Sequence, residues 1–527
     1  MKQFYLVFLL IILLVGTGCK QREYSSPGPP LIYISFNDTI TNSGVLPVEF
    51  RGNRYVSYEK GISDSSLNLS GSALYRKPVF IDKGPKNSFS DYKGFSVLIW
   101  VKAMGDDPHT YEIISQKKRT ENDNFEGWHI GKTATGGWEW EFRNGDQKLR
   151  YDPPHTHQPI DDGEWHMVGF TIDTSKEEAR FYYDGDLKSV YSMEGFETTF
   201  PETHISVGAG ALTDNPQTNA FNGMVDEMGI WSRALSAQQV TGFYKETYGY
   251  VPQPLPEYKD SLTVMTWNIR NGGTLQGKHV GVQRVAEVIR HSKADIVALQ
   301  ETMGSGETLA DELDFYYYRR STNLSILSRF PLAQSFNAFR ATNFGMVNVD
   351  IGGGRKIAMG PVWLSKRPNL SAYFMKNNAR ADTIEVREME TRGRETNFIL
   401  SEIRPFIENA DNVPVILAGD FNSGSHLDWT ERNKERHNDL VVDFPATQFM
   451  ESAGFQDAYR QIWPDETKTP GITWSPLYKE GLQTRMDFIF FKGEQLEPAW
   501  AKVIDTYRFG FPSDHAAVVV SFKINEP

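Results

Sequence analysis

The chain has 527 residues, of which 39% are hydrophobic and 13% aromatic, so it is globular and too long for one core. Two or three domains are therefore expected. The net charge of −12 argues against a nonspecific electrostatic grip on nucleic acid. With Cys19 as the single cysteine, no disulfide can form within the chain.

Residues 1–18 have the layout of a secretory signal peptide, with Lys2, an apolar run and small residues at the end. The run is too short to span a bilayer comfortably. Gly18-Cys19 resembles a bacterial lipoprotein cleavage site, although Gly16 stands where leucine is usual, and a plain signal peptide is the alternative. We therefore predict acylation of Cys19, a flexible spacer over residues 19–30, and an extracytoplasmic protein that contacts the bacterial membrane through its lipid anchor only.

Residues 31–250 read as short alternating strands between Gly, Asn, Asp and Pro turns, which predicts an all-β jelly-roll sandwich. The strongest strand candidates are residues 95–102, 128–131, 138–142, 164–172, 180–185 and 204–208. Segments 95–101, 162–185 and 223–235 resemble the laminin-G-like, concanavalin-like jelly-roll family. That resemblance implies a domain for glycan or surface binding.

Two details of this half have competing interpretations. Trp138 and Trp140 could stack on sugars, but filling the sandwich core is the favoured interpretation. Asp226 and Glu227 could bind Ca²⁺, but turn capping or pairing with Arg233 is favoured.

Residues 251–260 form a Pro-rich linker, and residues 261–527 alternate strands with helical patterns. This order predicts an α/β four-layer sandwich, with two sheets inside and helices outside. The predicted strands are residues 262–269, 296–300, 326–328, 356–364, 413–418, 485–491 and 516–522. The predicted helices are residues 281–292, 396–409 and 445–453.

Polar residues follow several of these strands, where a site can be assembled from distant parts of the chain. Glu301 is the best candidate metal ligand, Asn268 offers a carbonyl oxygen, and Asp514 can add a carboxylate. Mg²⁺ prefers such oxygen ligands. A hard cation neutralises the charge by which a phosphate ester repels the attacking water.

The remaining candidates are suited to proton transfer and phosphate contact. Asp420 and Asn422 lie two residues apart on a turn, so one can accept a proton while the other hydrogen-bonds a phosphate oxygen. His515 needs a carboxylate to set its tautomer or keep it protonated, and Asp487 is the expected partner. The set predicts hydrolysis of a phosphate ester.

Together these motifs resemble the endonuclease/exonuclease/phosphatase superfamily, whose fold is of the deoxyribonuclease-I-like type. The resemblance implies a Mg²⁺- or Mn²⁺-dependent hydrolase. It implies metal binding by Asn268 and Glu301, with Asp514 nearby. It further implies catalytic roles for four residues: Asp420 deprotonates water, Asn422 stabilises the pentavalent state, and Asp487 and His515 contact the scissile phosphate.

One position departs from the family pattern, because Trp363 stands where many members have a histidine. Simple core packing is the favoured interpretation of Trp363. The general acid therefore stays open between Lys366, Arg367 and a metal-bound water.

Several substrate classes fit: nucleic acid, phospholipid, inositol phosphate or sugar phosphate, as diester or monoester. The alternative function is a non-catalytic surface adhesin with a degenerate hydrolase domain.

Overall fold

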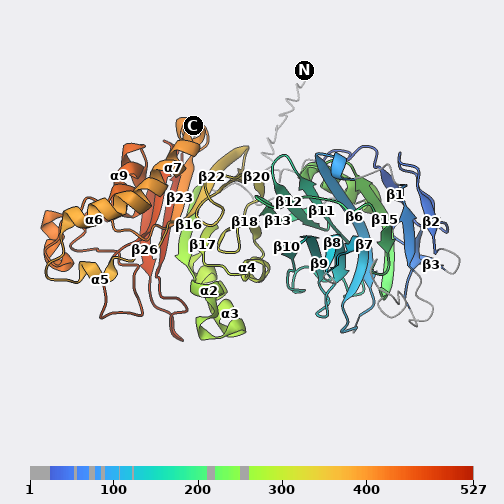
Figure 1. The fold of residues 1–527 in the computed structure, drawn as a ribbon, viewed down its shortest axis with the longest axis horizontal. Helices are drawn as coiled ribbons and strands as arrows, with labels where there is room; N and C mark the ends of the chain where they lie inside the picture. Colours follow the sequence, from blue (N-terminus) through green and yellow to red (C-terminus); the bar gives the residue numbers. More distant parts are fainter. Residues whose placement is uncertain are drawn as a thin grey trace, which may run out of the picture.

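The computed structural model describes residues 24–52, 56–70, 78–84, 89–105, 107–121, 124–210, 220–249 and 260–525. The predicted signal peptide, Cys19 and residues 251–259 of the predicted linker lie outside these ranges. Figure 1 shows two β-rich bodies side by side, one for each half of the chain. No helix among the described residues has both the length and the apolar character needed to cross a membrane.

The N-terminal body is a β-sandwich, as the sequence predicts, because alternating residues of its strands face a shared core. One sheet has the order β13-β12-β11-β6-β15-β4-β3, with β1 also paired to β15. Its strands are β1 (Ile32–Ile34), β3 (Ser57–Lys60), β4 (Ser65–Asn68), β6 (Gly94–Ala103), β11 (His166–Asp173), β12 (Glu178–Tyr183), β13 (Asp186–Ser192) and β15 (Gly223–Trp231).

The second sheet of the sandwich has the order β10-β9-β8-β7-β14-β5-β2. Its strands are β2 (Glu49–Arg51), β5 (Val79–Asp82), β7 (Tyr111–Arg119), β8 (Phe125–Lys132), β9 (Trp138–Asn144), β10 (Gln147–Tyr151) and β14 (Ile205–Val207). Helix α1 (Ala237–Tyr248) follows the sandwich and begins at a capping box between Ser236 and Gln239.

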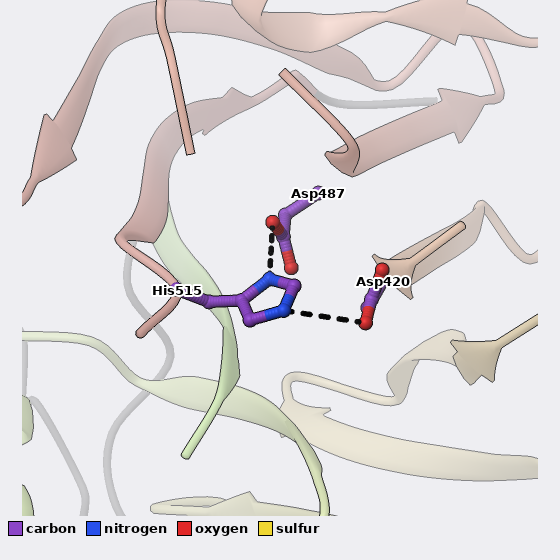
Figure 2. Close-up of side chains that lie close together, drawn as sticks. All are labelled: Asp420, Asp487 and His515. Atoms are coloured by element: carbon purple, nitrogen blue, oxygen red, sulfur yellow. Dashed lines mark hydrogen bonds and ion pairs between the residues drawn. The ribbon is translucent and has the colours of Figure 1, made fainter. Parts of the chain in front are cut away.

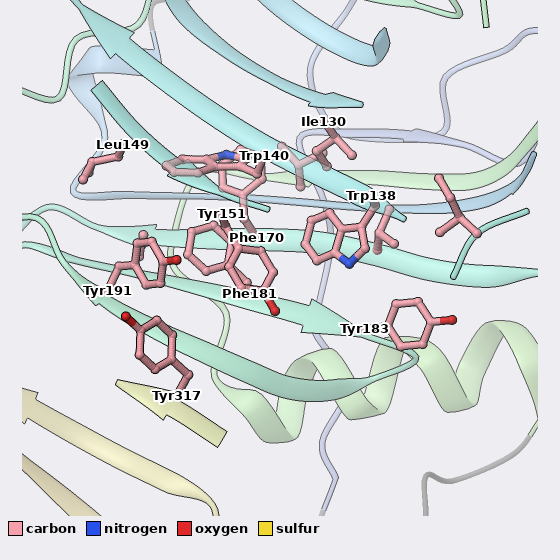
Figure 3. Packing of buried hydrophobic residues seen from close by; sticks show 14 of the residues in the cluster. Ile130, Trp138, Trp140, Leu149, Tyr151, Phe170, Phe181, Tyr183, Tyr191 and Tyr317 are labelled. Carbon is pink, nitrogen blue, oxygen red and sulfur yellow. The ribbon is translucent and has the colours of Figure 1, made fainter. Parts of the chain in front are cut away.

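Aromatic side chains fill the space between the two sheets (Figure 3). Trp138 and Trp140 are fully buried, and Tyr151 stacks on Phe181 with ring centroids 4.5 Å apart. The core interpretation of both tryptophans is confirmed. Neither ring is available for stacking on a sugar.

Asp226 and Glu227 serve the local structure of a neighbouring turn. The backbone N–H of Ile62 donates to Asp226, and the Ser63 hydroxyl donates to Glu227. Turn capping is therefore the role that the structure gives these carboxylates. Pairing with Arg233 is wrong, because that guanidinium donates to Gln239 and to the Pro27 carbonyl instead.

The C-terminal body is the predicted α/β four-layer sandwich. One sheet has the order β26-β27-β16-β17-β19-β18 and the other the order β20-β21-β22-β23-β25-β24. The first contains β16 (Ser261–Asn268), β17 (Ile296–Gln300), β18 (Tyr316–Arg319), β19 (Leu324–Ser328), β26 (Leu496–Ile504) and β27 (Ala517–Ile524). The second contains β20 (Leu332–Phe336), β21 (Met346–Gly352), β22 (Arg355–Trp363), β23 (Val415–Asp420), β24 (Gln456–Asp457) and β25 (Asp487–Lys492).

Helices cover the outer faces of both sheets (Figure 1). Those on the first sheet's side are α2 (Arg270–Gly273), α3 (Lys278–Ser292) and α4 (Gly306–Leu313). Helices α7 (Arg394–Glu402), α8 (Arg404–Glu408) and α9 (Pro445–Ser452) lie on the second sheet's side. Helices α5 (Ser371–Phe374) and α6 (Ala381–Glu388) pack in a separate small cluster, and α10 (Ala458–Ile462) packs into the core between the two sheets. Buried residues of α3 pack with β16 and β17, and those of α7 and α9 pack with β22, β23 and β25.

Two of the differences from the predicted element boundaries have a clear physical reason. The single helix expected over residues 396–409 is divided into α7 and α8, because Pro405 has no N–H to continue the α-helical ladder. The strand expected from Arg485 begins at Asp487. Arg485 is instead buried before the strand, where it pairs with Asp428 and Asp457.

The two halves share one continuous 14-stranded sheet, which the sequence pattern does not predict. Strand β13 of the jelly roll pairs in parallel with β18 of the second body, and Val190 aligns with Tyr318. Beside this junction, Arg320 is 2% exposed and donates to the Ser192 hydroxyl at 2.9 Å. Arg320 also pairs with Glu194 of the jelly roll. The junction fixes the orientation of one domain on the other.

We expect Arg320→Ala to lower the free energy of unfolding by about 3–5 kcal/mol, because it removes a fully buried guanidinium and leaves its acceptors, the Phe344 carbonyl and the Ser192 hydroxyl, without their donor. Chemical denaturation of the full chain measures this change. Arg51→Ala is the matched control, since its pair with Asp82 is exposed and should contribute about 1 kcal/mol or less. Equal effects of the two substitutions would show that the junction is not a stabilising contact.

Candidate active site

The predicted site residues come together at one edge of the two inner sheets. Asn268 ends β16, and Glu301 follows β17 directly. Asp420 ends β23 and lies opposite Asp487 at the start of the antiparallel β25. His515 precedes β27, which pairs with β16. Strand order and register therefore bring residues from five strands to the same place.

Asn268 links the two sheets. Its Nδ2 donates to Asp420 Oδ2 at 3.1 Å and lies 3.3 Å from Glu301 Oε1. The other Glu301 oxygen accepts the backbone N–H of Asn271 at 3.1 Å. Glu301 and Asn271 both have positive φ, a conformation that is uncommon outside glycine and clusters at functional sites.

Asp487 and Asp420 lie on either side of the His515 ring (Figure 2). His515 Nδ1 is 3.0 Å from Asp487 Oδ2, and Nε2 is 3.8 Å from Asp420 Oδ2. Burial lowers the pKa of His515, but the two carboxylates outweigh burial and raise it above its usual value. Burial raises the pKa of Asp420, with His515 opposing and Asp487 adding to the shift. The Asp487 and Asp420 carboxylates thus favour the protonated form of the His515 ring.

Asn422 and Asp514 complete the predicted set. The Asn422 backbone N–H donates to Asp420 Oδ1 at 2.8 Å, and its side-chain amide donates to Asp420 Oδ2 at 3.1 Å. Asp514 lies 3.5 Å from the Nε of Arg270. Burial raises the pKa of Asp514, while His515 and Arg270 oppose that shift.

A pocket of about 280 Å³ opens onto this arrangement. Six of the seven predicted residues line it, and the seventh, Asp487, lies fully buried behind His515. Lys366 also lines the pocket, whereas Arg367 is not among the lining residues. Of the side chains considered for the general acid, Lys366 is the one that borders the site.

Trp363 lines the pocket and is half-buried, so the expectation of simple core packing is wrong. The reason is its position as the last residue of β22, directly beside Asp420 in the sheet register.

The sequence pattern does not identify Trp474 and Arg270 as residues of the site. Trp474 packs edge-on against His515 with ring centroids 4.8 Å apart. The position of Arg270 directly after the Asn268-Ile269 pair was the signal available for it.

The donor set fits a hard divalent cation. Glu301, Asp514 and Asp420 supply carboxylate oxygens, and Asn268 supplies an amide oxygen. Asp420, Asp487 and His515 also bring ligand atoms within 4.8 Å of one another. Both ring nitrogens of His515 face carboxylates and Asp487 does not line the pocket, so the oxygen-rich Asn268–Glu301 side is the better location for an ion.

A buried histidine packs against Trp429, one of the pocket-lining residues, and its protonation is coupled to folding. His437 stacks on Trp429 with ring centroids 4.1 Å apart, and burial lowers its pKa to about 4. Between the unfolded pKa of 6.5 and the folded value, the unfolded chain binds a proton that the native chain does not. Stability therefore falls as the pH drops through this window.

We expect His437→Phe to keep the stacking on Trp429. It should reduce the decrease in the free energy of unfolding at acidic pH by on the order of 2 kcal/mol. Urea unfolding of both proteins at pH 7.5 and 4.5 measures the difference. An identical loss in the two proteins would contradict a neutral buried His437.

Comparison with known proteins assigns this geometry to a family. Residues 265–515 match the model of the Endonuclease/Exonuclease/phosphatase family, and residues 83–241 match that of the Concanavalin A-like lectin/glucanases superfamily. A stretch of 299 residues is 31% identical to an uncharacterized protein of Caenorhabditis elegans. That match covers 50% of this chain and 91% of the relative.

Solved structures resemble each half separately. Truncated Caenorhabditis elegans TDP2 is 19% identical, with 50% of this chain and 98% of that chain covered and a TM-score of 0.36. An endonuclease/exonuclease/phosphatase from Beutenbergia cavernae is 18% identical, with coverages of 51% and 72% and a TM-score of 0.33. Domain 4 of an extracellular arabinanase from Geobacillus stearothermophilus is 21% identical, with coverages of 41% and 98% and a TM-score of 0.31.

The family match over residues 265–515 spans all the strand-end residues described above. The chain therefore belongs to the endonuclease/exonuclease/phosphatase family, with a hydrolase domain of the phosphoesterase type in its second half and a lectin-like jelly roll in its first.

Proposed function

We propose that this protein is a Mg²⁺- or Mn²⁺-dependent hydrolase of a phosphate ester, anchored outside the cytoplasm through a lipid on Cys19. The observation that carries the enzymatic part is the contact between Asn268 and Asp420. It joins a carboxylate-rich end of one sheet to the Asp487–His515 pair at the end of the other. An ion site and a proton-transfer site thereby share one pocket.

Asn268, Glu301 and Asp514 would hold the cation, which when bound offsets the negative charge of the phosphate. The other residues act directly on the substrate and the attacking water. Asp420 accepts the proton of the water as it attacks phosphorus, because its carboxylate faces the pocket. The position of Asp420 is fixed by the hydrogen bonds from Asn422.

Two further groups stabilise the negative charge that develops on the phosphate oxygens. The Asn422 amide and the His515 imidazolium both border the pocket. Asp487 holds His515 by its Nδ1, which leaves Nε2 directed toward Asp420 and the pocket (Figure 2). The Nε2–H of His515 is a fixed donor that stabilises a transition state without having to reorganise. Asn422 donates to Asp420 and to the Leu364 carbonyl, so it reaches the phosphate by releasing one of these acceptors.

The jelly roll would hold the enzyme at a glycan or another surface. The shared sheet at β13 and β18 supports this part of the proposal, because a rigid junction presents the pocket in a constant orientation to whatever the jelly roll binds. The extracytoplasmic location rests on the lipoprotein-like sequence around Cys19. The adhesin alternative is less well supported, because a binding module has no need for the complete Asp420, Asn422, Asp487 and His515 arrangement.

Hydrolysis of a substrate panel tests the enzymatic proposal. A nucleotide, a phospholipid, an inositol phosphate, a sugar phosphate and an aryl phosphodiester would be offered to the full chain without residues 1–18. Phosphate release and diester cleavage would be measured separately. We expect turnover of at least one class with Mg²⁺ and its loss with EDTA. Turnover unaffected by EDTA would contradict a metal-dependent mechanism, and no turnover at all would favour the adhesin.

A further inference from the structure

The pocket extends beyond the residues assigned to hydrolysis into a second region with apolar walls. Residues from separate loops and short helices form these walls: Leu370, Phe374, Trp429, Phe444 and Leu482. The same five residues belong to a small hydrophobic cluster of their own, distinct from the main cores of the domain. The region is therefore a built structure with a packed wall, and it opens onto the site of chemistry.

A buried ion pair lies on this side of the pocket. Glu388 and Arg392 are 1% and 2% exposed, and both line the pocket. Glu388 Oε1 is 3.4 Å from an Arg392 nitrogen, and its Oε2 accepts the Ser423 hydroxyl at 2.8 Å. Burial raises the pKa of Glu388, while Arg392 and Ser423 oppose the shift. Burying such a pair costs free energy, so its presence beside a pocket requires a reason.

The hydrogen bonds of Arg392 are incomplete. One terminal nitrogen donates to the Pro368 carbonyl at 2.9 Å, and the other lies 3.4 Å from the Thr391 hydroxyl. Its buried Nε has no hydrogen-bond partner among the described residues. An unmet donor in a desolvated location is unfavourable, and a ligand in the pocket can satisfy it.

The backbone at this point is unusual. Residues Met389–Gly393 form a π-helix between α6 and α7, and Arg392 belongs to it. Single π-helical turns inside α-helices are rare overall, and those that occur are often found at functional sites. Glu388 and Arg392 are four residues apart, the spacing that places two side chains together on a helix face, and the π-helix begins directly after Glu388.

Chain connectivity places this region next to the reacting phosphate. Ser423, which donates to Glu388, directly follows Asn422 in the turn after β23. A group bonded to the phosphate at Asn422 therefore enters the region that contains Glu388 and Arg392.

We propose that this region is the specificity subsite for the alcohol part of the substrate and that it binds a single hydroxylated ring. The inference rests on the proposed function. A carboxylate beside a guanidinium offers an acceptor and a donor to neighbouring hydroxyls, and the two charges cancel, so neutral polar groups are favoured over a second phosphate. The apolar walls contact the C–H faces of the ring.

The size of the pocket agrees with one ring. About 280 Å³ lies near the lower limit for small-molecule sites, so the pocket itself has room for a phosphate and one ring. A pyranose, a cyclitol and the ribose of a nucleotide share the required chemistry.

The test compares esters of ring alcohols with an acyclic one. Glucose 1-phosphate, myo-inositol 1-phosphate and adenosine 5′-monophosphate would be compared with glycerol 1-phosphate, using the full chain without residues 1–18. We expect kcat/KM for at least one ring ester to exceed the glycerol value by at least about 10-fold. Glu388→Gln and Arg392→Met should lower the ring value by about 10- to 100-fold, mainly through KM. The ring ester with the higher kcat/KM identifies the class of alcohol that the subsite binds.

Glu178→Gln is a matched control. Glu178 is also buried, pairs with Arg180 and accepts a serine hydroxyl, but it lies in the jelly roll. We expect it to leave the ring preference unchanged. Because loss of a buried charge can prevent folding, Ser371→Trp provides a second variant that fills the pocket and keeps the ion pair. It should reduce ring esters more than the glycerol ester.

Binding separates the inference from the proposed function. Calorimetric titration of myo-inositol 1-phosphate, glucose 1-phosphate and adenosine 5′-monophosphate into an Asp420→Asn protein with Mg²⁺ needs no turnover. Loss of this binding when Glu388→Gln is added to the Asp420→Asn protein would support the subsite. If the native protein also hydrolysed none of these esters, the proposed function would be overturned while the subsite stood. Hydrolysis with no ring preference, or a preference unchanged in the Glu388, Arg392 and Ser371 variants, would overturn the subsite alone.

Discussion

Replacing Asp420 with asparagine is expected to lower kcat by about 10²- to 10⁴-fold, with little change in fold. Asparagine keeps the shape of the side chain and can still accept the backbone N–H of Asn422. It cannot take a proton from water. Asp420 is 1% exposed and its carboxylate accepts hydrogen bonds from Asn268 and Asn422, so its position in the site is fixed. Steady-state kinetics on the best substrate of the panel measures the change.

Asp295→Asn is the matched control for this substitution. Asp295 is buried beside the start of β17, at the opposite end of the strand from Glu301, and accepts the Thr263 backbone N–H. The substitution removes the same charge next to a strand of the facing inner sheet, and Asp295 is not a pocket-lining residue. We expect full activity. If both variants lost activity equally, the loss would reflect general destabilisation, and retention of activity in Asp420→Asn would remove the assigned base.

Replacing Glu301 with glutamine should lower kcat/KM by about 100-fold at limiting Mg²⁺, because one carboxylate oxygen of the ion site is replaced by an N–H donor. Glu301 faces two donors, the Asn268 amide and the Asn271 backbone N–H. The glutamine amide group cannot accept both hydrogen bonds. Weakened ion binding should be partly rescued by raising the Mg²⁺ or Mn²⁺ concentration.

Direct titration of Mn²⁺ provides a readout that does not depend on turnover. The apparent Kd should rise in Glu301→Gln and stay unchanged in Glu287→Gln, whose carboxylate bonds Tyr507 on the far side of α3. An unchanged Mn²⁺ affinity in Glu301→Gln would place the ion elsewhere. The Asp420, Asp487 and His515 group would then be the alternative location.

The local pattern of the sequence was sufficient to predict most of the architecture. Strand β17 was predicted with the bounds that the structure gives, and β16 and β27 differ by two residues or fewer at each end. Apolar β-branched runs flanked by polar turns carry this information because both are properties of adjacent residues. The candidate site followed from the same pattern, since polar residues directly after buried strands collect at one sheet edge.

Features that depend on contacts between distant segments were not predictable in this way. The β13–β18 pairing joins two domains through only three aligned residue pairs, and no periodicity signals it. Trp363 has the sequence context of a core residue, and only its register beside Asp420 places it in the pocket. Glu388 and Arg392 have the spacing of an ordinary helix pair in sequence, and only the tertiary packing buries them beside the pocket and against Ser423.

By itself the sequence determined which chemistry is available: oxygen ligands, a carboxylate base and a histidine with an acidic partner, each placed by its own strand. The tertiary structure decided how these groups meet, what shares their pocket and how the jelly roll is held. The physical reason is that secondary structure follows from interactions along a few neighbouring residues, whereas sheet order, domain junctions and pocket walls depend on which buried surfaces pack together across the whole chain.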